Sequence, residues 1–187
     1  MNDNIVAQFR LKHESLAGIV HTVAGTSEAA QKAAAILRDK AAQDVALGEL
    51  PDEFRQALEQ QCAGAGMHLL KPPFDHEGLP GTLNAIQAGV TWAALAIAET
   101  GAIVEFTTDD ALRLVSALPL VHIAVVRAAD MIATLKEAAA PIRNFYQENP
   151  LNANVTFISG PSRTADIEMR LIHGVHGPAE THTIIVH

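Results

Sequence analysis

Short apolar runs alternate with helical patterns from Asp44 to the end of the chain. The runs are rich in β-branched residues and short enough for strands buried on both faces; they read VALG, MHLL, WAALAIAE, AIVEF, LPLVHIAVV, VTFIS and THTIIVH. Helices are predicted over about 51–62, as a short helix that follows a turn at 78–81 and ends near Gly89, and over about 129–145 with a break or bend at Pro141. Strands separated by helices predict an α/β domain over 43–187, with a largely parallel sheet covered on both faces.

The first 42 residues have a helical pattern and are predicted to form an N-terminal helical segment attached to that domain. Apolar residues follow helical spacing at Ile5, Phe9, Leu16 and Ile19. Ser27, followed by the acidic Glu28, is typical of a helix start, and the alanine-rich stretch that follows continues to Arg38.

The passage from Ser159 to Pro178, SGPSRTADIEMRLIHGVHGP, is the richest in glycine, hydroxyl and charged residues. If VTFIS is a strand, Gly160 allows a sharp turn at its carboxyl end before a predicted helix. The amino terminus of that helix would point N–H groups into a cleft at the strand ends, where ligands of open α/β sheets bind. Ser162, Arg163 and Thr164 would add side-chain donors. We therefore predict a site for a carboxylate or another small anion; the alternative is that Ser162 and Thr164 only cap the helix.

The second half of this passage, GVHGP, places His176 among glycines, from which it can project into the same cleft and move a proton near neutral pH. The histidines near the C-terminus also raise the question of zinc; they are His173, His176, His182 and His187. Their spacing lacks a matching third ligand, so we predict no metal and expect surface or hydrogen-bonded histidines instead.

Composition narrows the classes of partner. A net charge of -8 argues against nucleic acid or an anionic membrane as the main partner. The first residues show no basic segment followed by an apolar run, and the apolar stretches are too short to span a membrane, so we predict a cytoplasmic protein without membrane insertion. Cys62 is the single cysteine of the 187 residues, which excludes an iron–sulfur cluster held by this chain alone. Any cluster must belong to a partner, and we predict no cofactor of its own.

Three motifs resemble the LUD-domain family, in particular its lactate utilization protein C group: AETG at 98–101, the LPLVHIAVV run, and above all SGPSRTADIE followed by GVHGP. The resemblance is strongest from about Gly78 to the end. It implies a three-layer α/β fold of the NagB/RpiA/CoA-transferase-like type. It also implies a part in oxidising L-lactate to pyruvate beside iron–sulfur partner subunits, which fits a chain with one cysteine.

Glu99 supports a competing prediction. It follows an apolar run, with Thr100 and Gly101 after it, so these three residues can reach the same cleft as Ser162. A buried glutamate has a raised pKa and can act as a base or nucleophile, and CoA-transferase-like enzymes use a glutamate covalently. The alternative function is therefore a free-standing acyl or CoA transferase with Glu99 as nucleophile. The structural alternative is that Glu99 accepts hydrogen bonds from loop N–H groups and holds the loop.

Overall fold

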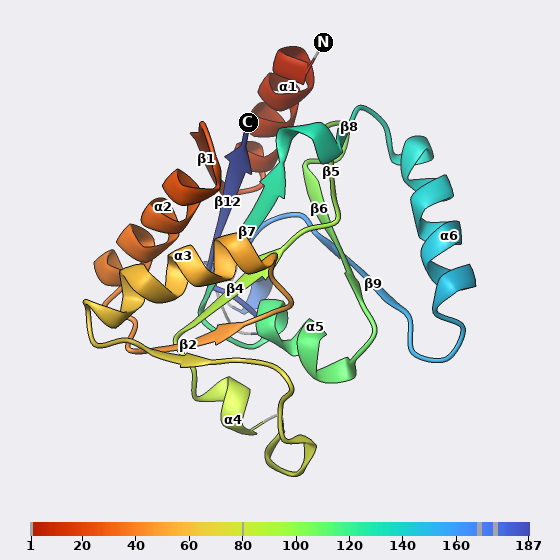
Figure 1. Cartoon of the computed structure of the whole chain (residues 1–187). Helices are drawn as coiled ribbons and strands as arrows, with labels where there is room; N and C mark the ends of the chain where they lie inside the picture. Colours follow the sequence, from red (N-terminus) through yellow and green to blue (C-terminus); the bar gives the residue numbers. More distant parts are fainter. Residues whose placement is uncertain (1, 80, 168–169, 174–175) are drawn as a thin grey trace.

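A six-stranded parallel sheet forms the centre of the computed structural model, which describes residues 2–79, 81–167, 170–173 and 176–187 (Figure 1). The strand order is β1-β12-β7-β4-β2-β3, and every neighbouring pair is parallel. The strands are β1 Ile19–Val23, β2 Asp44–Leu47, β3 His68–Leu70, β4 Ala88–Trp92, β7 Val121–Arg127 and β12 Glu180–Val186. Because the strands run in one direction, their carboxyl ends share one edge of the sheet, which is where open α/β folds bind ligands.

Helices α2 (Thr26–Asp39) and α3 (Asp52–Ala63) cover one face of this sheet and pack against each other. Leu37 and Phe54 from these helices share a core with Ile184 of β12. The next residue, Ile185, points to the opposite face, where it packs with Phe9 of α1 (Asn2–Ser15). Neighbouring residues of one strand thus enter different cores, which explains why the sheet strands are apolar without alternation.

The second face is covered by α1, by the short helices α4 (Gly81–Asn84) and α5 (Asp110–Ala117), and by a four-stranded sheet in the order β8-β5-β6-β9. The strands of this second sheet are β5 Leu95–Ile97, β6 Ala102–Thr107, β8 Met131–Ile132 and β9 Asn154–Ile158. Helix α6 (Ala139–Glu148) packs on the far side of this sheet through Ile142 and Phe145. The predicted three-layer α/β fold with a mostly parallel main sheet and an N-terminal helix is confirmed.

Smaller elements complete the described part of the chain. They are the 3-10 helices η1 His76–Gly78, η2 Ala128–Asp130 and η3 Leu135–Ala138, and a hairpin of β10 Arg163–Ile167 and β11 Arg170–His173. Within the described ranges, no helix has the length and apolar character needed to cross a membrane.

Two predicted helical stretches are wrong. Residues 19–23 form β1, which pairs with β12 at the edge of the main sheet, because IVHTV is dominated by β-branched residues. Residues on both sides of position 42 therefore share one sheet and one core, while the division of the chain at that position stays a prediction. In the predicted helix over 129–145, the strand β8 comes first and α6 begins only at Ala139, so Pro141 lies in the first helical turn, where proline is tolerated.

The predicted helix after Ser162 is also wrong, because the chain forms the β10–β11 hairpin there. Polar and apolar residues alternate from Thr164 to Leu171, which is a period of two and is typical of a strand. No helix terminus therefore follows Ser162, and the predicted anion site loses its helical N–H groups.

Candidate functional site

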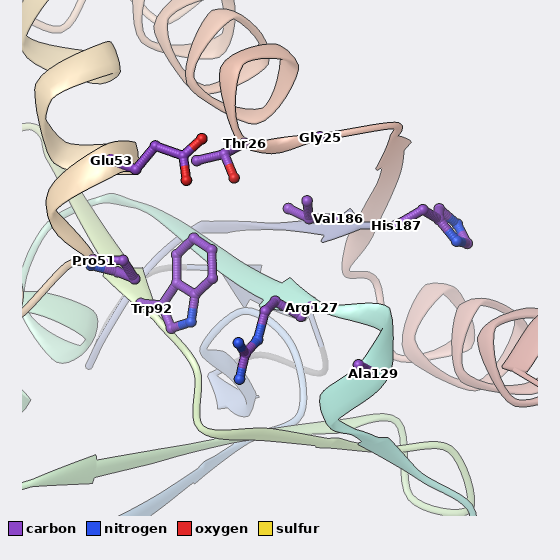
Figure 2. A pocket seen from close by; sticks show the side chains of 9 residues that line it. All are labelled: Gly25, Thr26, Pro51, Glu53, Trp92, Arg127, Ala129, Val186 and His187. Carbon is purple, nitrogen blue, oxygen red and sulfur yellow. The ribbon is translucent and has the colours of Figure 1, made fainter.

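Four adjacent parallel strands end around a cavity of about 440 Å³ at the carboxyl edge of the main sheet (Figure 2). Trp92, Arg127 and Val186 are the last residues of β4, β7 and β12, and Gly25 follows β1. The lining residues are Gly25, Thr26, Pro51, Glu53, Trp92, Arg127, Ala129, Val186 and His187. The cavity therefore lies where the topology of the sheet places a ligand site.

Helices α2 and α3 both begin at the cavity wall. Their cap residues, Gly25 and Pro51, make no side-chain cap hydrogen bond. The first N–H groups of a helix need partners from side chains, water or a ligand, and the positive end of the helix dipole favours an anion. This part of the wall can therefore stabilise negative charge.

Arg127 supplies the cation of the cavity. Its Nε and Nη2 donate to the two carboxylate oxygens of Asp130 at 2.6 and 3.1 Å, and these bonds raise the pKa of the guanidinium. The ion pair with Asp130 fixes the orientation of the guanidinium, and Nη1 of Arg127 takes no part in these two hydrogen bonds. Glu53, in the first turn of α3, brings a carboxylate to the same cavity, so an anionic group fits best on the Arg127 and α2 side.

A buried polar chain lies beside Trp92. Thr91 donates its hydroxyl hydrogen to Glu105 of β6, and the same hydroxyl oxygen lies 2.8 Å from Nε2 of His122. Because the hydroxyl hydrogen is used for Glu105, Nε2 of His122 carries a hydrogen and donates it. Burial raises the pKa of Glu105, but hydrogen bonds from His122, Thr91 and Ser116 outweigh this and lower it. A small hollow lined by Thr91, Trp92 and Glu105 adjoins the main cavity at Trp92.

His122, within the LPLVHIAVV run, is a core residue in which one ring nitrogen has hydrogen-bond partners. His122 is fully buried, and its Nε2 has Thr91 and Glu105 as partners. Within the described chain, its Nδ1 has no partner.

Glu99 is exposed, so it is not the buried glutamate that the competing prediction requires. Its carboxylate accepts a hydrogen bond from the backbone N–H of Leu135 at 2.8 Å, which is the structural alternative stated for this residue. Thr100 accepts a weak bond from the N–H of Ala102 within the β5–β6 turn. Gly101 has a φ of +66°, and its carbonyl accepts a hydrogen bond from His13 of α1, so this glycine holds α1 against the turn.

The Ser162 loop lies at the opposite edge of the main sheet. The N–H of Ser162 donates to the carbonyl of Pro178 at 2.8 Å, and the N–H of Ala179 donates to Leu120, just before β12 and β7 begin. The loop follows β9, which belongs to the second sheet, so it does not reach the carboxyl edge of the first. The Ser162 loop and the cavity at the carboxyl edge are therefore separate candidates for the ligand site.

The other predicted residues are placed as follows. Gly160 has a φ of +127° and lies against the carbonyl of Leu16, at the end of α1. Ile103 pairs with Ile158, so the loops that carry Gly101 and Gly160 meet at one end of the second sheet. Arg163 and Thr164 form the start of β10, and their side chains lie outside the described part of the structure.

His176 is exposed. Among the described residues, no group of three or more histidine, cysteine, aspartate or glutamate side chains is arranged to hold a metal ion. His182 instead lies in a hydrogen-bonded chain: its Nδ1 is 3.1 Å from Nε2 of His21, and its Nε2 is 2.6 Å from Glu180, which also pairs with Lys40. The side chain of His173 lies outside the described residues.

The sequence reasoning missed Arg127, Trp92, Thr26 and Glu53 as site residues. The signal was available, because each residue directly after a parallel strand is a candidate in an α/β fold. Trp92 begins the predicted strand WAALAIAE, although β4 ends at this residue, and 19–23 were predicted as helix. The ends of β4 and β1 were therefore not recognised as part of this candidate site.

Comparison with known proteins assigns the chain to a family. The model of the LUD domain matches residues 6–186. The chain belongs to the LUD domain family. The resemblance predicted from SGPSRTADIE and GVHGP is thereby confirmed.

This LUD domain has relatives named lactate utilization protein C. The protein from Shouchella clausii is 40% identical over 98 residues, which cover 52% of this chain and 43% of that protein. The protein from Geobacillus kaustophilus is 29% identical over 179 residues, covering 90% of this chain and 74% of that protein. The alignment to the first relative thus spans less than half of its length. The crystal structure of a DUF162 family protein from Deinococcus radiodurans has the same fold, with a TM-score of 0.72, 24% identity, and coverage of 100% of this chain and 99% of that chain.

Proposed function

We propose that this LUD domain takes part in lactate utilization, as a subunit that carries no iron–sulfur cluster and acts with iron–sulfur partner proteins in the oxidation of L-lactate to pyruvate. The family match over 6–186, together with relatives named lactate utilization protein C, carries the proposal. The single cysteine, Cys62, is buried and therefore fits a subunit that leaves electron transfer to its partners.

In this proposal the subunit binds an anionic ligand in the cavity at the carboxyl edge of the main sheet. The support is the position of the cavity beyond the strand ends, the guanidinium of Arg127, and the amino terminus of α2. The C-terminal motif, with Arg163 and His176, remains the second candidate for the ligand site.

A complementation experiment separates the two candidate sites. A strain that lacks this protein and grows poorly on L-lactate is complemented with Arg127→Gln, with Arg163→Ala, or with His176→Ala. We expect Arg127→Gln to impair growth on lactate without lowering the amount of folded protein. Arg113→Gln is the matched control, because Arg113 also pairs with an aspartate three residues away on the surface.

Loss of growth in Arg163→Ala or His176→Ala, with Arg127→Gln unaffected, would move the ligand site to the C-terminal motif. Normal growth of the deletion strain on lactate would refute the role in lactate utilization itself. Failure to purify iron–sulfur proteins together with this chain from lactate-grown cells would contradict the proposed partners.

The alternative function, a free-standing acyl or CoA transferase that uses Glu99, has a direct test. The exposed position of Glu99 argues against it, because the alternative requires a buried glutamate, and the carboxylate instead accepts a hydrogen bond from the N–H of Leu135. Turnover of an acyl-CoA by the isolated chain, lost in Glu99→Gln, would establish this enzyme instead.

A further inference from the structure

The cavity at the carboxyl edge is larger than a three-carbon acid requires. Its volume of about 440 Å³ lies in the range of about 300–1,000 Å³ that holds drug-sized ligands and cofactors. Lactate or pyruvate would occupy a minor part of it. The size therefore indicates a larger anionic ligand, and this inference rests on the anion site of the proposed function.

Trp92 gives the cavity an aromatic wall. Figure 2 shows its indole pointing into the cavity, with Pro51 on one side and Arg127 on the other. On its buried side the indole packs against Phe54, with ring centroids 5.5 Å apart. A tryptophan fixed by packing on one side, with its remaining surface in a cavity, is suited to stack on a planar ring. It is the only tryptophan of a chain in which aromatic residues make up 4%.

The polar groups around Trp92 differ in charge and lie on different elements. Arg127 ends β7 and carries a positive charge, which attracts a phosphate or carboxylate. Glu53 lies on α3, and its carboxylate can accept hydrogen bonds from hydroxyl groups, as an acidic side chain does with ribose in dinucleotide-binding folds. The cavity thus offers a stacking surface, a cation and a hydroxyl acceptor.

From the cavity size, the indole and these two charges together, we propose that the cavity binds a nucleoside phosphate, with the base stacked on Trp92, the phosphate on Arg127 and the sugar hydroxyls on Glu53. A small carboxylate alone uses only the Arg127 part of this site.

Because Trp92 is the only tryptophan, its fluorescence reports the occupancy of this cavity directly. The purified full chain is titrated with adenosine monophosphate (AMP), ribose 5-phosphate, adenosine and lactate. We expect AMP to change the fluorescence of Trp92 with saturation, and to bind at least ten-fold more tightly than ribose 5-phosphate, adenosine or lactate.

Calorimetry on variants separates the contributions of ring and phosphate. Trp92→Leu should weaken AMP at least ten-fold and leave ribose 5-phosphate unchanged, while Arg127→Gln should weaken AMP at least ten-fold and leave adenosine unchanged. Arg113→Gln should bind AMP like the original protein. Thermal melts check that each variant is folded. If Trp92→Leu is destabilised, the ratio of the affinities for AMP and ribose 5-phosphate in the original protein tests the stacking role.

Equal affinity for AMP and ribose 5-phosphate would overturn the stacking role of Trp92 and leave an anion site in place. Equal affinity of AMP for the Arg127→Gln variant and the original protein would overturn the phosphate role of Arg127. If neither AMP nor ribose 5-phosphate nor lactate binds at millimolar concentration, both this proposal and the anion site of the proposed function fail, whereas the lactate growth test stands independently.

Discussion

His13 and Gly18 should be strongly coupled in their effect on stability. His13 is fully buried in α1 and stacks on Phe9, and its ring nitrogens lie 2.7 Å from the carbonyl oxygen of Gly101 and 3.1 Å from the hydroxyl of Thr183. Since the carbonyl only accepts, Nδ1 donates to Gly101 and Nε2 accepts from Thr183. Burial lowers the pKa of His13, so the ring is neutral. A Cβ on Gly18 would lie 2.1 Å from Nε2 and 2.2 Å from Cδ2 of this ring.

Gly18→Ala therefore has to displace the ring of His13. The loss of two buried hydrogen bonds costs about 1 kcal/mol each, and the overpacking adds roughly 1–3 kcal/mol. The expected cost is about 3–5 kcal/mol of unfolding free energy, or a fall in melting temperature of roughly 6–20 °C at about 2–4 °C per kcal/mol. His13→Ala should cost about as much, because it leaves a cavity and two unpaired polar groups.

The two substitutions together should cost little more than His13→Ala alone, because the shortened side chain no longer meets the new Cβ. Urea unfolding of the original protein, both single variants and the double variant measures this coupling, which we expect at about 2–4 kcal/mol. Additive costs within about 0.5 kcal/mol would refute the reasoning. So would a cost below about 1 kcal/mol for His13→Ala, since two buried bonds alone exceed it.

Two further predictions concern stability. Gly89→Ala should cost more than about 3 kcal/mol of unfolding free energy or prevent folding, because its Cβ would lie 1.9 Å from the backbone carbonyl oxygen of Val115 in α5. Urea unfolding measures this cost. The control is Gly64→Ala, whose Cβ would meet open space and which should change stability by less than about 0.5 kcal/mol. Burial, followed by the proximity of His182, lowers the pKa of His21 from 6.5 to about 4. The unfolded chain therefore binds a proton more readily than the folded one between these values, and stability falls as pH drops from 6.5 to about 4. His21→Gln should reduce this loss of stability by about 1 kcal/mol, a value discounted because the ring is half exposed. An unchanged pH profile in the variant would contradict the assignment of this loss to His21.

The sequence predicted strands of both sheets where the apolar runs were short and bounded by loop residues. LPLVHIAVV, VTFIS and THTIIVH coincide with β7, β9 and β12, because β-branched residues in a short run favour a strand whatever surrounds it. The period of two between Thr164 and Leu171 was equally readable and was misinterpreted as a helix. Because of that error and the missed strand β1, the sequence did not predict the cavity at the carboxyl edge of the main sheet as a candidate site.

By itself, the sequence determined the α/β class and the family, because these follow from local periodicity and an extended motif. Only the tertiary structure decided which strand ends meet. Trp92 and Arg127 are 35 positions apart, and they line one cavity because β4 and β7 are neighbours in the sheet. Strand order depends on which strands pair after long crossover connections, and the local sequence pattern does not specify that pairing. The same pairing places Ser162 at the amino edge of the sheet, away from the cavity.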